Sequence, residues 1–463
     1  MLLAALVVLC PRTGGAQTPL TLDEAIARTL AANDAVRAAA AARDEARART
    51  DQARAGYLPR VDLIEGWQRG NHPVFVFSSL LAQRRFTAAN FALDALNHPD
   101  PLSNHRFAVT IEQTIFDGLR TNATVDGARI DEGIAQARST QTAAELRLGV
   151  VAAYGRAFSA RTAHETARAA AAAAAEDLRR TEDRRDAGLE AESSVLAMRV
   201  HAAEVEARRI RAASEQSIAR AALNALMNVP LDDDRPLVEP PLPCAGDLDV
   251  ETLSAAAVAS RPELKEAALM RDRAATLGRI ARSGFLPQVV VLGAAEADGD
   301  SFADRASAWS AGIEVRWNLF AGGGDAARRR EAAAAATRAE AERAGIETAV
   351  RLDVREAIAR YESAVAREAA ARRMVDQARE SQRMIRDRYE AGLTPASELL
   401  RAAEAVVQAD STRTAAVVDV LVSLAALDRA AGRTSASTDA GGSNAAHPRS
   451  ATAGHTSEAG VTR

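Results

Sequence analysis

Apolar residues recur at helical spacing along two long, highly charged stretches of the chain. In the clearer stretch they advance in steps of four and three, the narrow stripe of a coiled-coil seam, at Ile346, Val350, Val354, Ile358, Tyr361 and Val365. Arg, Glu and Asp occupy the remaining faces. The pattern predicts long helices at 121–186 and 325–390, each roughly 100 Å in length at ~1.5 Å per residue. A returning helix is predicted after each, ending near Asn228 or Ala431.

The spacing changes to an alternation of apolar and polar residues in four short segments. The apolar positions of the last segment are Trp309, Ala311, Ile313, Val315, Trp317 and Leu319, and those of the second are Phe107, Val109, Ile111 and Ile115. Weaker pairs follow two Leu-Pro motifs, at Val61 and Leu63 and at Val289 and Val291. We predict four strands of about ten residues, each with one apolar and one polar face.

Trp309 and Trp317 bracket the apolar face of the fourth predicted strand. They are about 26 Å apart at ~3.3 Å per residue, and an apolar band of ~25 Å flanked by aromatic residues is typical of an outer-membrane barrel. We therefore expect both at the membrane interface. A soluble sheet packed on a helix is the alternative, and the high charge of the available helices disfavours it. Four strands cannot close a membrane barrel and an open edge cannot face lipid, so several chains would have to share one barrel.

Two near-identical turns reveal an internal duplication. "DAGLEAESSVL" at 186–196 and "EAGLTPASELL" at 390–400 place Gly188 and Gly392 204 residues apart (392 − 188). "IFDGLR" and "LFAGGG" repeat at the same offset, whereas "AGYLP" and "SGFLP" repeat at 228 (287 − 59). The first half therefore carries 24 extra residues (228 − 204) between its Leu-Pro motif and its long helix. Each turn glycine is expected to supply the positive φ that ends a helix and closes an antiparallel hairpin.

The landmarks divide the chain into two repeats, at 17–228 and 251–431, joined by a Pro- and Asp-rich linker at 229–250. A helix is predicted to run into each Leu-Pro motif, from Leu22 to about Ala53 and from Leu253 to about Ala281.

Both chain ends depart from the repeat pattern. Residues 1–16 hold an apolar run too short to span a bilayer, followed by small residues, as in a secretory signal peptide. Residues 432–463 are Ser, Thr, Gly, Ala and His without an apolar period, which predicts a disordered tail. Removal of the signal would take Cys10 with it and leave Cys244 alone, so no intrachain disulfide would form.

Composition supports long, closely packed helices. Hydrophobic residues make up 48% of the chain but aromatic residues only 4%, and much of the apolar content is alanine, which favours helix and buries little area. The net charge of −4 arises from interspersed charges of both signs, which argues against a nucleic-acid partner.

In its order of duplicated motifs, the sequence resembles the TolC family of outer-membrane efflux and secretion ducts. The resemblance rests on "GYLP" and "GFLP", "IFDG" and "LFAGG", and the two "AGL" turns, and it covers about residues 20–433. It implies a mainly α fold with a small β part. Four strands per chain would contribute to a trimeric twelve-stranded outer-membrane barrel, with an α-helical tunnel in the periplasm.

The resemblance further implies a passive homotrimeric exit duct in the bacterial outer membrane, in contact with its lipid. Such a duct serves a tripartite efflux or type I secretion system. It has no enzyme activity and no catalytic, cofactor-binding or metal-binding residues. Its partners would be a periplasmic adaptor and an inner-membrane pump of the RND, ABC or MFS type, and the adaptor would dock at Gly188, Leu189, Gly392 and Leu393. Drug, metal and protein substrates all remain open.

The resemblance also assigns a gate to the tip of the second hairpin. Glu398 falls where such ducts place an acidic ring, whereas Arg401 replaces a second acidic residue. Tyr389 matches a tyrosine that tethers the closed tip, and Thr394 replaces a basic tether residue, so the closing network must differ. Glu398 as a solvated surface carboxylate is the alternative.

Three other interpretations compete with these assignments. His72, His98 and His105 lie in or beside the extra residues, where an external loop at about 70–104 is favoured over a metal site because no ligand spacing is evident. A soluble coiled-coil scaffold would explain the helices but not the signal peptide or the strands. A periplasmic adaptor would carry one hairpin, not two repeats with strands.

Overall fold

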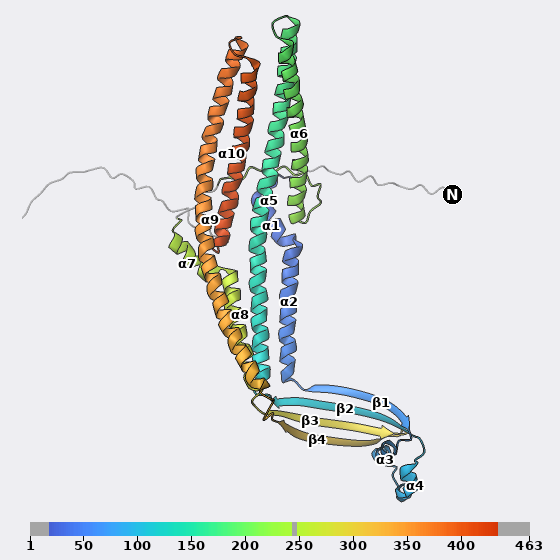
Figure 1. Cartoon of the computed structure of the whole chain (residues 1–463). Helices are drawn as coiled ribbons and strands as arrows, with labels where there is room; N and C mark the ends of the chain where they lie inside the picture. The colour runs from blue at the N-terminus through green and yellow to red at the C-terminus, as the bar shows by residue number, and fades with distance from the viewer. Residues whose placement is uncertain (1–17, 243–247, 434–463) are drawn as a thin grey trace, which may run out of the picture.

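The two charged stretches fold into very long helices, each paired with a shorter one. The computed structural model describes residues 18–242 and 248–433, so the predicted signal peptide and most of the predicted tail lie outside the described residues. The hairpins are formed by α5 (Arg120–Asp186) with α6 (Glu192–Leu226) and by α9 (Gly324–Glu390) with α10 (Ala396–Ala430). Both hairpin tips point the same way, and a four-stranded sheet lies at the opposite end of the molecule (Figure 1). The predicted fold class is confirmed.

The helix that leads into each Leu-Pro motif is broken in two, whereas one continuous helix is predicted from the sequence. The pieces are α1 (Leu22–Ala32) and α2 (Asp34–Arg54), and α7 (Val250–Ser260) and α8 (Pro262–Ser283). The breaks, at Asn33 and Arg261, are related by the repeat offset of 228 (261 − 33), and both residues are extended. Asn33 caps α2 by accepting a hydrogen bond from the Ala35 N–H, and Pro262 begins α8 because it has no N–H to continue α7.

The coiled-coil seam of α9 follows the prediction over its central part. Val350, Val354, Ile358 and Tyr361 are buried, and they pack with residues of α7 and α10. Val365, the last predicted member, remains 42% exposed. The seam passes instead through Ala364, which is 1% exposed, because a step of three after Tyr361 keeps the stripe aligned with the partner helix.

The first repeat has its own core, which ties the linker to the helices. Tyr154 of α5 is 1% exposed, and its hydroxyl lies 2.8 Å from the Leu20 carbonyl oxygen and 2.6 Å from that of Val238. Leu20 and Leu237, both buried, pair through a short parallel bridge. The chain before α1 and the linker are thus held together on α5.

The sheet is antiparallel with strands in chain order, and its two edges are unpaired within the chain. Its strands are β1 (Arg60–Gly70), β2 (Leu102–Phe116), β3 (Gln288–Gly299) and β4 (Ala306–Arg316). Trp317, predicted within the fourth strand, lies just beyond its end, where its indole N–H donates to the Phe285 carbonyl oxygen (3.1 Å). A short 3₁₀ turn, η1 (Ala55–Tyr57), leads into β1. None of the helices in the described part is long and apolar enough to cross a membrane.

The segment between β1 and β2 contains short helices. They are α3 (Pro73–Ala82), the 3₁₀ turn η2 (Ala88–Phe91) and α4 (Leu93–Asn97). We call residues 71–101 the insert. It lies at the end of the sheet farthest from the long helices (Figure 1).

Candidate functional site

The two hairpin tips have the same backbone geometry. Gly188 and Gly392 adopt φ of +75° and +72°, and no atom lies within 4 Å of where a Cβ would stand. The left-handed backbone, and not lack of space, is therefore what favours glycine here. The next N–H, that of Leu189 or Leu393, donates to a carbonyl of the last helical turn at 2.8 or 2.9 Å, which closes each long helix.

Leu189 and Leu393 are each 71% exposed at these tips. A single exposed leucine is ordinary, but here each of the two hairpin tips presents one at the equivalent position, where a partner can cover it.

The carboxylate of Glu398 does not stand alone in the described structure. It lies in the first turn of α10, and its Oε1 pairs with Arg401 Nη1 at 2.7 Å, one turn along the same helix. Both side chains are substantially exposed, so the pair contributes little stability. Its main effect is to place a positive charge beside the carboxylate.

Tyr389 is held by a cation from the other hairpin. The guanidinium of Arg184, on α5, lies 5.7 Å from the centre of the Tyr389 ring on α9. The Tyr389 hydroxyl is buried and has no hydrogen-bond partner among the described residues. Arg184 is not among the residues predicted from the sequence, although the 204-residue offset makes it the counterpart of Arg388, directly before the tyrosine (388 − 184).

A second contact joins the hairpins further from the tips. Arg208 Nη1 on α6 lies 2.7 and 2.6 Å from the two carboxylate oxygens of Glu404 on α10. Together with the Arg184–Tyr389 contact, this partly exposed ion pair links the two hairpins, whereas their apolar packing lies at Val151 of α5 with Val417 and Leu421 of α10.

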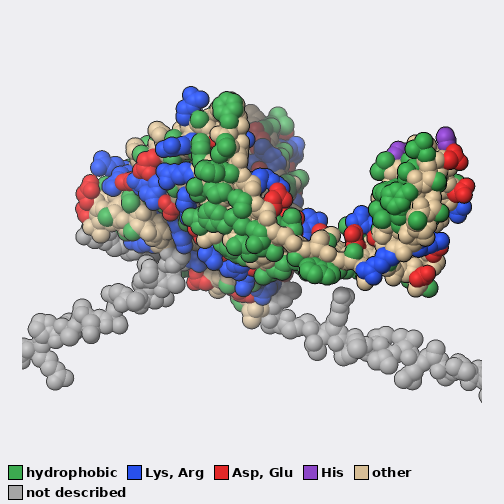
Figure 2. All heavy atoms as spheres, turned by 90° about the horizontal axis from the view of Figure 1, so that it is seen from below, with side chains coloured by type: hydrophobic (Ala, Val, Ile, Leu, Met, Phe, Trp, Pro, Cys, Tyr) green, Lys and Arg blue, Asp and Glu red, His purple; other side chains and the backbone are tan. Residues whose placement is uncertain are grey.

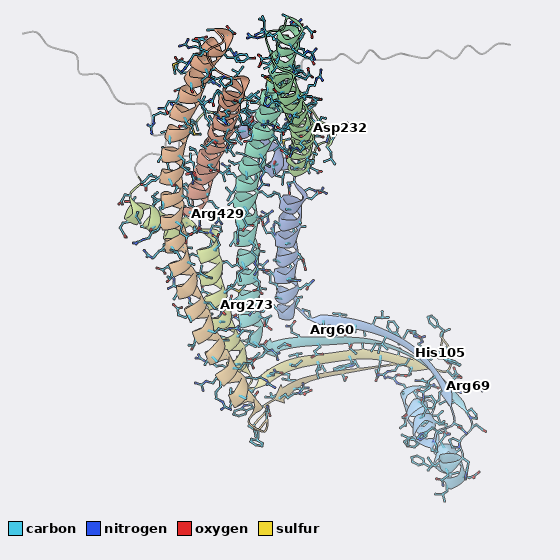
Figure 3. All side chains as sticks on the ribbon, turned by 45° about the horizontal axis from the view of Figure 1, so that its top comes forward. Arg60, Arg69, His105, Asp232, Arg273 and Arg429 are labelled. Carbon is cyan, nitrogen blue, oxygen red and sulfur yellow. The ribbon has the colours of Figure 1, made fainter. Side chains whose placement is uncertain are left out.

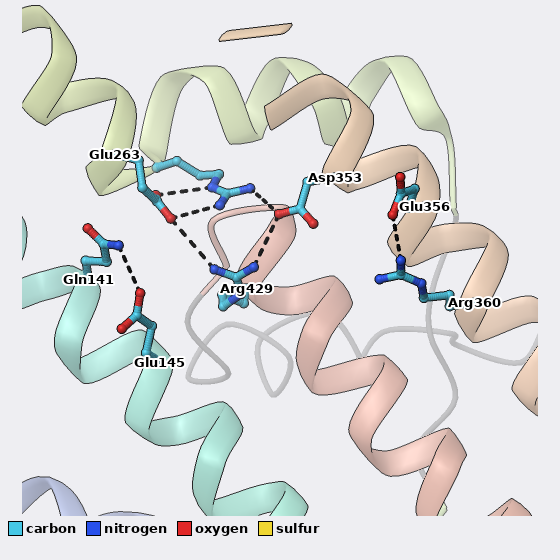
Figure 4. A network of polar contacts seen from close by, with 8 residues as sticks. Gln141, Glu145, Glu263, Asp353, Glu356, Arg360 and Arg429 are labelled. Atoms are coloured by element: carbon cyan, nitrogen blue, oxygen red, sulfur yellow. Dashed lines mark hydrogen bonds and ion pairs between the residues drawn. The ribbon is translucent and has the colours of Figure 1, made fainter. Parts of the chain in front are cut away.

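An ion-pair network surrounds the helix break of the second repeat (Figure 4). The side chain of Arg261 is 6% exposed, and its guanidinium lies 2.8 Å from Glu263 and 2.6 Å from Asp353. Arg429 of α10 reaches the same two carboxylates at 3.8 and 3.4 Å. Burial by itself raises the pKa of Glu263, but hydrogen bonding and charge from Arg261 outweigh it, so the pKa of this carboxyl lies below its ordinary value.

The two faces of the sheet differ in polarity, although by strand alternation the more apolar face also carries Glu65, which pairs with Arg305 at 2.7 Å. The apolar face exposes large side chains along the edge strands: Val61, Leu63, Trp67, Trp309, Ile313 and Val315 are between 59% and 82% exposed. The opposite face carries ion pairs, including Arg106 with Glu296 at 2.9 Å and Arg60 with Asp62 at 2.8 Å. Along the length of the sheet, Arg60 marks the end that adjoins the long helices, and His105 lies toward the opposite end (Figure 3). An exposed apolar band of this extent indicates contact with lipid or protein.

The histidines near the insert do not converge. His98 pairs with Asp94 of its own helix at 3.2 Å, and the His105 ring lies 6.4 Å from that of Trp67. Over residues 18–242 and 248–433, no group of three or more His, Cys, Asp or Glu side chains is arranged to hold a metal ion.

Comparison with known proteins points to one family. Residues 25–229 and 253–433 match the profile of a family described as outer membrane efflux protein. No curated protein matches the chain in sequence.

Three similar solved structures are the outer membrane channels CmeC of Campylobacter jejuni, MtrE of Neisseria gonorrhoeae in its open state, and VceC of Vibrio cholerae. Their TM-scores are 0.73, 0.71 and 0.71, with sequence identities of 16%, 18% and 20%. Each alignment covers 89% of this chain and, in the same order, 85%, 89% and 96% of the other. At these identities the likeness shows a shared fold.

Proposed function

This chain belongs to the outer membrane efflux protein family and is a transport channel rather than an enzyme; on that premise, we propose that three copies form the exit duct of a tripartite efflux or type I secretion system. The barrel would lie in the bacterial outer membrane and the long helices in the periplasm. A periplasmic adaptor would dock at the hairpin tips and connect the duct to an inner-membrane pump. The duct itself is passive, and the pump selects the substrate.

The observation that carries this proposal is the incomplete sheet. Its four strands leave β1 and β4 unpaired at the edges, and one face exposes an apolar band. A membrane barrel needs closed edges and at least eight strands, so three chains of four strands provide a closed twelve-stranded barrel. The polar face would then line the lumen and the apolar face would contact lipid, with Trp309 and Trp317 near the two interfaces.

Trimer formation tests this proposal directly. Membranes from cells that produce the protein are fractionated, and the outer-membrane fraction is run on a denaturing gel with and without boiling. We expect a heat-sensitive trimer band in that fraction. A monomeric, water-soluble protein would favour the coiled-coil scaffold instead, and a periplasmic monomer would favour an adaptor.

Adaptor docking is assigned to Gly188, Leu189, Gly392 and Leu393, because both leucines are exposed at equivalent points of the tips. Replacing both leucines with aspartate should abolish export, since charge prevents an apolar contact, while trimers remain in the membrane. The change Thr337→Asp, at an exposed polar position of α9 far from the tips, is the control for added charge. Normal export by the double variant would exclude the tips as the docking site.

The gate is assigned to the same end of the molecule. Three copies of Tyr389 and Glu398 would surround the narrow tip, with Arg184 holding Tyr389 and Arg401 offsetting Glu398. The paired charges favour a weak and salt-dependent preference for cations.

A further inference from the structure

The insert is a folded unit with its own small aromatic cluster. Phe77 of α3 packs edge to face on Phe86, with ring centres 4.8 Å apart, and Phe86 packs in the same way on Phe91 at 5.1 Å. Such pairs add stability beyond the area they bury. Val76 and Ser79 of α3 are buried as well. The segment therefore has one defined shape and is more than a flexible connection between β1 and β2.

A buried polar chain fixes the insert to one particular face of the sheet. Gln83 Nε2 donates to Asn104 Oδ1 at 2.8 Å, and Asn104 Nδ2 donates to Asp298 Oδ1 at 2.6 Å. All three side chains are less than 10% exposed. By strand alternation, Asn104 and Asp298 lie on the same face as Arg106 and Glu296, which is the polar face.

Two further arginines extend this attachment across the sheet. Arg85 Nη1 pairs with Asp300 Oδ2, just beyond β3, at 2.5 Å. Arg84 Nη2 donates to the carbonyl oxygen of Ser307 in β4 at 2.7 Å. The insert, which begins after β1, is thus bonded to three other parts of the sheet, at β2, after β3 and at β4. These two contacts are exposed, so they add to the attachment that the buried chain of Gln83, Asn104 and Asp298 provides.

The exposed surface of the insert carries apolar side chains beside the exposed Asp94–His98 pair. Val74, Leu81, Phe91 and Leu93 are between 50% and 77% exposed. Figure 2 shows hydrophobic side chains gathered on this lobe at the far end of the molecule.

We propose that the insert narrows the outer mouth of the duct, where three copies meet through these apolar side chains and form a second constriction, separate from the gate at the hairpin tips. This inference rests on the proposed function, because the polar face lines a lumen only when three sheets close into a barrel. A unit bonded to that face then projects into the lumen. Continuity with the open sheet edges places the inserts of neighbouring copies around the same axis.

The constriction has a chemical consequence for what passes. An apolar ring in a water-filled pore opposes ions and large hydrated solutes, because water withdraws from a narrow apolar passage. Compact or amphipathic molecules can pass by contact with Phe91 and Leu93. The second repeat carries no equivalent segment, since β3 and β4 are joined by only six residues, 300–305. The first repeat alone therefore sets the size limit at the outer mouth.

Conductance in planar bilayers tests the constriction. In one variant, the whole insert, residues 71–101, is replaced with Asn-Gly, which suits a two-residue hairpin between the paired ends Gly70 and Leu102. Single-channel conductance should rise several-fold, and polyethylene glycols too large for the parent channel should enter. The reference is the conductance of the parent channel, recorded at the same applied voltage so that the state of the hairpin tips is the same in both channels.

A second experiment keeps the whole chain. Leu93→Cys on the insert is compared with Ile313→Cys on the apolar sheet face, two positions that are 77% and 73% exposed in the single chain. A charged, water-soluble thiol reagent should reduce the current of the Leu93→Cys channel and leave that of the Ile313→Cys channel unchanged, because lipid covers the latter. Unchanged current in the Leu93→Cys channel would overturn the constriction, whether or not the shortened variant assembles. A parent chain that forms no channel at all would refute the duct itself, and with it the constriction.

Discussion

At the scale of single residues, Tyr389 depends on a cation that the other hairpin supplies. The Arg184 guanidinium lies over the Tyr389 ring, whereas the Tyr389 hydroxyl has no partner among the described residues. We expect Arg184→Gln to raise the resting conductance of the duct, because the contact between the hairpins at the tip is lost. Tyr389→Phe keeps the aromatic face and should change resting conductance much less. The opposite order, with Tyr389→Phe the leakier channel, would mean that the hydroxyl bonds to a neighbouring copy.

The charge at the second candidate gate position is a pair, not a lone carboxylate. Because Arg401 lies 2.7 Å from Glu398, removing the arginine should expose three unpaired carboxylates around the axis. Arg401→Gln should therefore increase cation selectivity, and Glu398→Gln should shift it toward anions. Reversal potentials across a salt gradient measure both effects, which should weaken at high ionic strength. If neither substitution moves the reversal potential, Glu398 is a solvated surface carboxylate and the constriction lies elsewhere.

At the scale of elements, the broken helix of the second repeat depends on the buried guanidinium of Arg261. Removing it leaves Glu263 and Asp353 with only Arg429 nearby. We expect Arg261→Met to destabilise the helical part by about 3 kcal/mol, the low end for breaking a buried pair. Arg360→Met, which breaks the exposed pair with Glu356 in the same region (Figure 4), should cost no more than ~1 kcal/mol. The thermal midpoints of the helical circular dichroism signal compare the two variants.

The same network predicts how the stability depends on pH. The pKa of Glu263 is lower in the folded chain than in the unfolded chain. The contribution of Glu263 to the free energy of unfolding is therefore fully present above the ordinary pKa of glutamate. It is lost as the pH falls through the pKa that Glu263 has in the folded chain. The difference in thermal midpoint between the parent and Arg261→Met should shrink as the pH is lowered into that range. A difference that stays constant down to strongly acidic pH would show that packing, and not this ion pair, accounts for the effect.

Elements with a strong local signal could be predicted from the sequence, and elements set by distant contacts could not. The long helices, the hairpin turns and the alternating strands follow from periodicity and from glycine, which act over a few residues. The break at Asn33 could not be predicted in this way, because the Asn33 Nδ2 donates to the carbonyl oxygen of Leu226, almost two hundred residues away. Arg184 was missed for the same reason, since its partner Tyr389 lies on the other hairpin.

The helices of the insert were also not foreseen, and the reason again lies in distant contacts. Its ten-residue α3 is apolar on most of its length, so it has no clear amphipathic period. It is held by Gln83, whose partners Ser103 and Asn104 belong to β2. The predicted loop at about 70–104 therefore marked where the extra residues lie, but not that they fold or which face of the sheet they meet.

At the scale of the whole molecule, the orientation of the barrel decides where every other feature acts. The long helices leave one end of the sheet, and the insert lies at the other (Figure 1). If the helices extend into the periplasm, the insert faces the outside of the cell, as long barrel loops do. A short epitope tag inserted after Asn97, at the end of α4, should bind antibody on intact cells, because Asn97 is exposed and is not among the side chains proposed to meet neighbouring copies. The same tag after Gly188, at a hairpin tip with open space around it, should bind only after permeabilisation. The reverse pattern would show that the barrel has the opposite orientation. The insert, with its apolar side chains, would then lie at the periplasmic mouth, and the hairpin tips would lie outside the cell, where no periplasmic adaptor can reach them.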